Sequence, residues 1–371
     1  MKPQITYLTP MSNDDRLIRD EELALDADLA EQLEAARGKF LFDTQRRAIF
    51  AMQRERNATR ASEAEKQAKR AAMPRDKRKR AEICEVFENE GPSPENLRFM
   101  HSVLAICGLP YRQLPEGVLE FERTQGRMGL VVTAGKLRAP DGTRIQQPVP
   151  YGPKARLLLA HLTTQAILTQ SPEIELADTL TGFLRDLGFP ATGGKAGTLH
   201  AFKTQLNALF ACHMEISSWD GHKATTIKAE PFDSVEVFFS ENPDQRSLWA
   251  STIRFSDKMF TGLVKHAIPM DMRALRAFQG SARKLDMLFW LGYRLHSIRA
   301  PLTITYKALA EQFGDGYARQ IDFQRALARD VAHLREVFPK LPIKLTEQGM
   351  TIQNADPSVL MLPLPTKAKK R

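Results

Sequence analysis

A glycine cluster followed by a lysine is the part of this sequence whose residue types and spacing suit nucleotide chemistry. In the segment GFPATGGKAGT (188–198), a glycine-rich turn precedes a helical pattern, an arrangement that can hold a phosphate. A phosphate-binding loop needs G-x-x-x-x-G-K-[ST] after a buried strand. Gly188 and Gly193 have the required separation, but Gly194 stands at the lysine position and a helical pattern precedes Gly188. The motif therefore favours a flexible turn before a DNA-reading helix.

No other residue pattern points to catalysis. The eight histidines are scattered, and no H-x-H or HExxH spacing places two of them on one metal site. Cys84, Cys107 and Cys212 are far apart and odd in number, which disfavours a zinc ribbon or a disulfide framework. No GxSxG sequence occurs. We therefore expect a protein without enzymatic activity, without a cofactor and without a metal.

The charge balance favours an anionic partner. Lysine and arginine total 53 against 44 acidic residues, a formal net charge of +9. The segment KQAKRAAMPRDKRKR (66–80) concentrates this charge and is either a solvated linker or an arm that contacts phosphates. No apolar run is long enough to span a bilayer, and the N-terminus lacks the pattern of a signal peptide. We expect a cytoplasmic protein with no membrane role.

Two stretches of the chain repeat one order of elements. Between 153 and 228 the pattern predicts a helix, a short strand, two helices and a hairpin that turns at Asp220-Gly221. Between 282 and 353 the same order returns. This is the order of a winged helix, so we predict an α+β, mainly helical fold with tandem winged-helix domains after a helical, partly disordered N-terminal arm. The predicted domains are 1–80 (helical, basic arm), 81–270 (first winged-helix domain with inserted strands), 271–356 (second winged-helix domain, the main DNA reader) and 357–371 (basic tail).

Two helix starts are marked by residues that can cap. In GPSPENLRFMHSVLAICGLP (91–110), Ser93 precedes Pro94 and Gly108 follows an apolar run, so one helix is predicted to fill this interval. Ser256 is predicted to cap a helix that follows two strands in the segment between the repeated units. Both predictions depend on local signals alone.

The third helix of the second predicted unit offers two arginines to a DNA groove. Its apolar positions recur at helical spacing, which leaves Arg325 and Arg329 on the opposite side, one turn apart. Arginines in that position suit guanine and phosphate contacts in a major groove. A plain solvent-exposed face is the other interpretation of the same pattern. The predicted buried stripe is Phe323, Leu327, Val331, Leu334 and Phe338.

The third helix of the first predicted unit has a small, polar outer face centred on His200, Thr204 and Ala208. Such a face suits close contact with a DNA backbone or with another subunit. The tips of the two hairpins can reach flanking phosphates. The predicted buried stripe is Leu199, Phe202, Leu206, Leu209 and Phe210. The complete predicted DNA-binding set is Lys195, Thr198, His200, Lys203, Thr204, Asn207, His222, Lys223, Arg319, Gln320, Asp322, Arg325, Arg329, Lys344 and Gln348.

The chain resembles the RepA-type plasmid replication initiators. The resemblance spans about Met100 to Phe338 and rests on PYGPKARLLLAHLTTQAILTQSPEIEL, LGFPATGGKAGT, PMDMRALRAF and LDMLFWLGYR, in that order. It implies two winged helices that bind repeated double-stranded DNA sites, or iterons, in a plasmid origin. It also implies opening of an adjacent AT-rich duplex and recruitment of the host initiator and replicative helicase. Members often repress their own gene as homodimers through the first unit and initiate as monomers, with the second unit dominating base readout.

Two other functions fit parts of the pattern. A transcriptional regulator with the same fold would bind an inverted repeat as a dimer and be dispensable for plasmid maintenance. An ATP-dependent enzyme would use residues 188–195, and calorimetry would then detect nucleotide binding. Tandem DNA repeats of about two helical turns, roughly 20 bp, beside the gene would favour initiation over both. An initiator would be cytoplasmic and associated with the bacterial nucleoid or plasmid.

Overall fold

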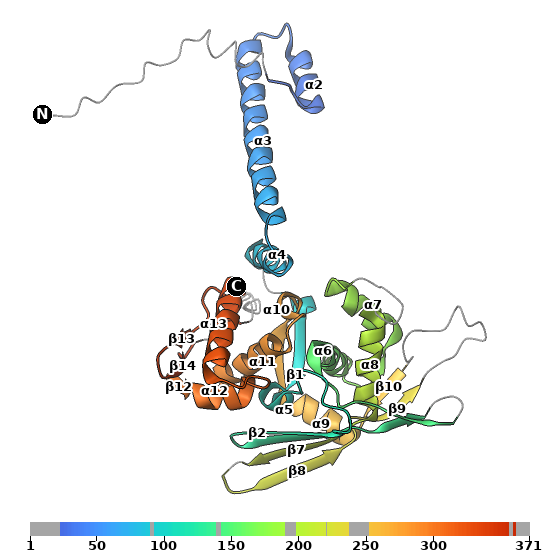
Figure 1. The fold of residues 1–371 in the computed structure, drawn as a ribbon. Helices are drawn as coiled ribbons and strands as arrows, with labels where there is room; N and C mark the ends of the chain where they lie inside the picture. Colours follow the sequence, from blue (N-terminus) through green and yellow to red (C-terminus); the bar gives the residue numbers. More distant parts are fainter. Residues whose placement is uncertain are drawn as a thin grey trace, which may run out of the picture. The chain divides into compact units, whose positions relative to one another are not determined.

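The computed structural model is α+β and mainly helical, with small antiparallel sheets, as the sequence predicts (Figure 1). The chain divides into two compact units, Met1–Arg78 and Lys79–Arg371. Among the described residues, no helix combines the length and the apolar character needed to cross a membrane. Residues 1–22 of the predicted arm, residues 190–197 of the predicted turn and most of the predicted tail 357–371 lie outside the description. The structure describes residues 23–89, 93–138, 142–189, 198–219, 221–236, 252–355 and 359–360.

The first unit contains two helices that pack against each other. α2 (Ala27–Ala36) contacts α3 (Phe42–Ala71), and the apolar side chains of Leu29, Ile49 and Phe50 are buried. From residue 54 to the end of α3 no side chain is buried, so this half of the helix is a solvent-facing rod. The basic segment predicted at 66–80 covers the end of α3 and the start of α4, which runs Arg75–Asn89.

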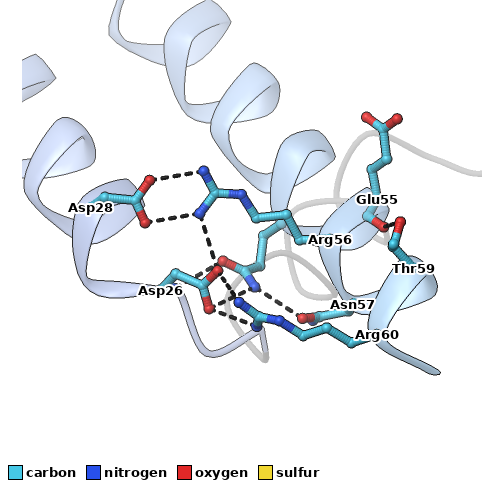
Figure 2. Close-up of polar contacts among 8 residues, drawn as sticks. Asp26, Asp28, Glu55, Arg56, Asn57, Thr59 and Arg60 are labelled. Carbon is cyan, nitrogen blue, oxygen red and sulfur yellow. Dashed lines mark hydrogen bonds and ion pairs between the residues drawn. The ribbon is translucent and has the colours of Figure 1, made fainter. Parts of the chain in front are cut away.

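Polar side chains fasten the start of α2 to α3 (Figure 2). Asp26, the N-cap residue of α2, accepts hydrogen bonds from Arg60 at 2.8 and 2.6 Å and from Arg56 at 3.1 Å. The backbone N–H of Asp26 donates to Oε1 of Gln53 at 2.8 Å, and Arg56 donates to both oxygens of Asp28 at 2.8 Å. Hydrogen bonds from Arg60 and Arg56 hold the pKa of Asp26 well below its usual range. This Asp26 clamp is therefore charged at neutral pH.

The centre of the second unit is formed by α6 (Gly152–Thr169) and α11 (Ala282–Ser297), which contact each other. Most side chains of α6 are buried, as in a helix covered on all sides by other elements. Arg156 of α6 and Asp286 of α11 form a buried ion pair, with Nε–Oδ1 at 2.5 Å and Nη2–Oδ2 at 2.7 Å. The pair joins segments that lie far apart in the sequence.

A strand pairing that local signals did not indicate also closes this core. β1 (Leu97–His101) pairs with β11 (Ala267–Asp271). The single helix predicted across 91–110 is therefore wrong. Ser93 caps only a short 3-10 turn, where its Oγ accepts a hydrogen bond from the N–H of Glu95 at 3.2 Å, and the helix proper is α5 (Ser102–Cys107). Pairing with β11 satisfies the backbone N–H and C=O groups of this half-buried segment. These hydrogen bonds outweigh the local preference of the sequence for a helix.

Two small sheets of the second unit share one strand order. In the C-terminal half, β12, β14 and β13 lie in that order, with α12 and α13 between β12 and β13 in the chain. In the N-terminal half, β6, β10 and β9 repeat it: first strand, last strand, middle strand. The bounds are β12 (Leu302–Thr305), α12 (Tyr306–Phe313), α13 (Gln320–Val337), β13 (Ile343–Leu345), β14 (Gly349–Ile352), β6 (Glu173–Glu175), α7 (Ala177–Asp186), α8 (Thr198–Ala211), β9 (Phe232–Glu236) and β10 (Thr252–Phe255).

The predicted hairpin after α8 forms, but it does not belong to the β6 sheet. β7 (His213–Trp219) and β8 (Ala224–Ala229) lie in a four-stranded sheet of order β2-β3-β7-β8, with β2 (Glu120–Gln125) and β3 (Met128–Thr133). β7 pairs along all of β3, whereas β6 has only three residues to offer and pairs with β10 instead.

The remaining elements connect these layers. α9 (Asp257–His266) starts after Ser256, whose Oγ accepts a hydrogen bond from the N–H of Met259 at 3.4 Å, which confirms the predicted cap. α10 (Met272–Phe278) follows β11 directly. β4 (Lys136–Arg138) and β5 (Arg144–Gln146) form the short ribbon between β3 and α6.

Candidate nucleic-acid interface

The glycine cluster begins where a helix ends, and this bears on whether the segment can be a phosphate-binding loop. Gly188 has φ +75°, and its N–H donates to the carbonyl of Arg185 at 2.7 Å just past α7. This geometry is a helix C-terminus that needs glycine in the left-handed region. A helix, α7, precedes Gly188 in place of the buried strand that a phosphate-binding loop requires. Lys195 lies outside the described residues.

α13 presents two arginines on the side that faces away from the core. The predicted stripe is confirmed, with Phe323, Leu327, Val331, Leu334 and Phe338 all buried. Arg325 and Arg329 are exposed, and the side chain of Arg325 is 72% accessible. Among the described residues Arg329 makes no ion pair. The helical period alone produces this separation of faces.

Asp322 gathers two guanidinium groups at the N-terminal end of α13. Nε of Arg319, the residue before the helix, donates to Asp322 Oδ2 at 2.7 Å, and Nη1 of Arg325 lies 4.0 Å from Oδ1. The side chains of Arg319 and Asp322 are 71% and 36% accessible. Exposed ion pairs of this kind contribute little to folding stability. A DNA phosphate can therefore replace the carboxylate of Asp322 as the partner of these arginines with little loss of stability. Gln320 is exposed beside them.

Contacts from α11 hold α13 and the turn before it in place. Arg283 donates from Nε to Oδ2 of the buried Asp330 at 2.6 Å and from Nη1 to the hydroxyl of Tyr317 at 2.7 Å. Asp330 therefore faces the core while Arg329, its neighbour in the sequence, faces outward. Arg335, near the other end of α13, donates to the carbonyl of Ile343 in β13. These contacts position the exposed face of α13 relative to the rest of the second unit.

The hairpin β13–β14 is fixed beside the end of β12. The N–H of Thr346 donates to the carbonyl of Gly349 at 2.8 Å, and the hydroxyl of Tyr306 donates to the carbonyl of Thr346 at 3.0 Å. Any Cβ at Gly349 would lie 1.9 Å from the carbonyl oxygen of Ile304, so only glycine allows this pairing. Lys344 and Gln348 are both exposed on this hairpin. Gln348 lies in the turn, as the sequence predicts, whereas Lys344 lies within β13, opposite Thr351, and not at the tip.

α8 exposes less of the predicted outer face than its period suggests. His200 and Lys203 are exposed, and Thr198, Thr204 and Asn207 are half-buried. Ala208, predicted on the outer face, has no exposed surface, so that prediction is wrong. α8 packs against α6 and also contacts β4, so its surroundings are not those of a helix with one free face. Of the predicted buried stripe, Phe202, Leu206 and Leu209 are buried, and Leu199 and Phe210 are half-buried.

A pocket of about 310 Å³ lies between α8 and the start of α6. His200 and Thr204 of α8 line it together with Tyr151 and Lys154. Lys154 lies in the first turn of α6, where helix N–H groups and the helix dipole favour an anion. Sequence reasoning missed Lys154. The signal was present, because Pro153 marks a helix start and the lysine follows directly.

The β7–β8 turn carries His222 and Lys223, which are exposed as predicted. It joins two strands of the four-stranded sheet, and in Figure 1 the end of that sheet where β8 begins lies away from α8. The predicted residues thus form three separate groups in the second unit: α13 with β13–β14, α8 with the start of α6, and the β7–β8 turn. In Figure 1, α6 and α11 lie between α8 and α13.

Two of the three cysteines are buried thiols. Burial raises the pKa of Cys107 and of Cys212 to about 12, so both thiols are protonated at neutral pH. Within the described part of the chain, no group of three or more His, Cys, Asp or Glu side chains could hold a metal ion. The exposed cationic groups on α13 are the chemistry that this surface offers.

Comparison with known proteins gives one family. Residues 149–306 match the family described as "Plasmid encoded RepA protein". This confirms the resemblance over the segment from just before α6 to the first residue of α12, and α13 lies beyond the match. No curated protein matches the chain.

Two solved structures of domains 2 and 3 of RctB resemble the chain in outline. One has 10% identity and a TM-score of 0.42 over 69% of this chain and 99% of that one. The other has 8% identity and a TM-score of 0.44 over 71% of this chain and 100% of that one. Scores this low do not establish a shared fold.

Proposed function

We propose that this protein is a plasmid replication initiator that binds repeated double-stranded DNA sites, or iterons, in the plasmid origin. The observation that carries the proposal is the arginine face of α13, held by α11 and followed by a hairpin with exposed Lys344 and Gln348. The RepA match over 149–306 supports a plasmid role. The excess of basic residues over the whole chain agrees with an anionic partner.

In this proposal the second unit contains two winged helices. One consists of α11, β12, α12, α13 and β13–β14; the other consists of α6, β6, α7, α8 and β9–β10, with β7–β8 inserted. α13 lies in a major groove, where Arg325 or Arg329 binds guanine O6 and N7 and the other binds phosphate. Lys344 and Gln348 contact a flanking phosphate. Lys154 and His200 bind backbone phosphate beside α8.

The finer steps come from the family resemblance. Binding opens an adjacent AT-rich duplex and recruits the host initiator and the replicative helicase. The first winged helix forms a homodimer that represses the protein's own gene, and the monomer initiates replication. The protein acts in the cytoplasm, associated with the plasmid or nucleoid, and uses no cofactor or enzymatic step of its own.

The experiment is a footprint of the full chain on the DNA next to its gene, with and without Arg325→Ala plus Arg329→Ala. We expect the wild type to protect direct repeats. Each lost phosphate contact reduces the slope of log K against log salt concentration by about 0.9, and a lost guanine contact costs about 1–3 kcal/mol. Plasmid replication should fail in the double variant.

The matched control is Arg112→Ala plus Arg299→Ala, which removes the same charge from exposed positions outside the three groups. It should retain the footprint. If the Arg325 and Arg329 variant protects the repeats as the wild type does, the assignment of α13 is wrong. If the wild type protects only an inverted repeat and the plasmid persists without it, the protein is a transcriptional regulator and not an initiator.

A further inference from the structure

The outward face of α13 is partly apolar. Ile321 is 47% exposed and precedes Arg325 by one turn. Ala328 and Ala332 are exposed further along the helix. At 3.6 residues per turn, these four residues share one face of the helix. The face therefore combines one large aliphatic group, one guanidinium group and two small side chains.

Exposure to water does not account for Ile321. Ala, Glu, Lys and Gln are all strong helix formers that suit a solvent-facing position, whereas a β-branched residue lowers helix propensity there. The two alanines remove bulk from the same face, so that the backbone of α13 can approach a partner closely. Arg319 and Arg325 lie at the same end of α13 as the aliphatic group, and Arg329 follows Arg325 by one turn; Asp322 pairs with the first two of these arginines. A partner that fits must offer an apolar group within an anionic surface.

We propose that Ile321 contacts the 5-methyl group of a thymine in the major groove and thereby sets sequence specificity at one base pair. The proposal rests on the DNA-binding function proposed above and names a residue that the charge pattern did not indicate. In the major groove, thymine alone presents a methyl group, and aliphatic side chains recognise it by burying it. The phosphates on either side supply the negative charge that the arginines match. The thymine lies one turn of α13 from the DNA group that Arg325 contacts, because the two side chains are one turn apart.

The fixed position of α13 makes such a contact specific. Arg283 holds both Asp330 of α13 and Tyr317 of the preceding turn, so Ile321 enters the groove at a set depth. A mobile side chain on a loose turn would bury any nearby base edge equally.

The experiment uses the full chain and a synthetic duplex that carries one protected repeat. Each thymine is replaced in turn by uracil, which removes only the methyl group, and the dissociation constant is measured by fluorescence anisotropy. One replacement should weaken wild-type binding about fourfold, the effect of losing one buried methylene-sized group, about 0.8 kcal/mol. Ile321→Ala should bind the thymine duplex less tightly and should not distinguish it from the uracil duplex. Ile321→Val should retain part of the difference.

The matched control is Val264→Ala, because Val264 of α9 is also 47% exposed and β-branched but lies on another helix. It should show the full uracil effect. Circular dichroism checks that each variant is folded, and Ile321→Val keeps the comparison valid if Ile321→Ala is not.

Each remaining outcome overturns the inference in a distinct way. If the wild type binds the repeats but no uracil replacement weakens it, or if the uracil effect persists in Ile321→Ala, Ile321 does not read thymine and the initiator function stands. If Ile321→Ala changes self-association without changing DNA affinity, the face contacts a second copy of the chain. If the wild type binds no repeat at all, the proposed function fails together with the inference.

Discussion

Replacing Asp286 with asparagine removes the carboxylate that balances a guanidinium group buried at the centre of the second unit. Arg156 is 2% exposed and Asp286 is 3% exposed. Arg156 also donates to the carbonyls of Leu109, Pro110 and Gly152, so it cannot turn toward water without losing several hydrogen bonds. Removing one partner of a buried ion pair leaves an unbalanced charge and costs about 3–5 kcal/mol. We expect Asp286→Asn to lower the free energy of unfolding by that amount.

The assay is urea unfolding at neutral pH, followed by circular dichroism and by tryptophan fluorescence, to which the buried Trp290 of α11 contributes together with Trp219 and Trp249. Arg156→Met should lower the free energy of unfolding by a similar amount. The double variant Arg156→Met with Asp286→Leu should lower it by much less than the sum of the two single effects, because both buried charges are then removed together. The control is Asp257→Asn, which breaks a pair with Arg254 in which Asp257 is 83% accessible; its cost should stay below about 1 kcal/mol. If Asp286→Asn unfolds within about 0.5 kcal/mol of the wild type, or if the single effects simply add, the pair does not join α6 to α11 as described.

Two further predictions concern pH and the first unit. Burial lowers the pKa of His161 to about 3, whereas an unfolded histidine titrates near 6.5, so the unfolded state takes up the proton first and stability falls as the pH drops below about 6.5. Because of His161, the free energy of unfolding measured in urea should be about 2 kcal/mol lower at pH 5 than at pH 7. In His161→Leu this contribution to the pH dependence should be absent. If the wild type and His161→Leu show the same pH dependence, the low pKa of His161 is contradicted. Asp26→Ala should speed hydrogen exchange of the amides of α2, because Arg56 and Arg60 lose the carboxylate they share. Glu34→Ala, which breaks an exposed pair with Arg37, should leave that exchange nearly unchanged, and equal rates in both variants would show that the clamp does not hold α2.

Features set by neighbours along the chain were predictable. The stripe from Phe323 to Phe338 and the outward position of Arg325 follow from the helical period. The cap at Ser256 and the helix end at Gly188 follow from the geometry that those residues favour. In each case the deciding interactions lie within one or two turns, so the sequence contains the information locally.

Features that depend on partners far away in the sequence were not predictable from the sequence. Residues Leu97–His101 became a strand because β11 was available to pair with them, and β7 joined β3 in place of β6 for the same reason. Ala208 is buried although the helical period places it opposite the apolar stripe, and α8 contacts both α6 and β4, which its own period does not predict. Side-chain periodicity determines which residues can face outward, and the approach of other segments determines which of them do. The sequence by itself thus determined the arginine face of α13, whereas the tertiary structure alone decided its anchoring on α11, the pairing of Arg156 with Asp286, and the exposure of Ile321 beside Arg325.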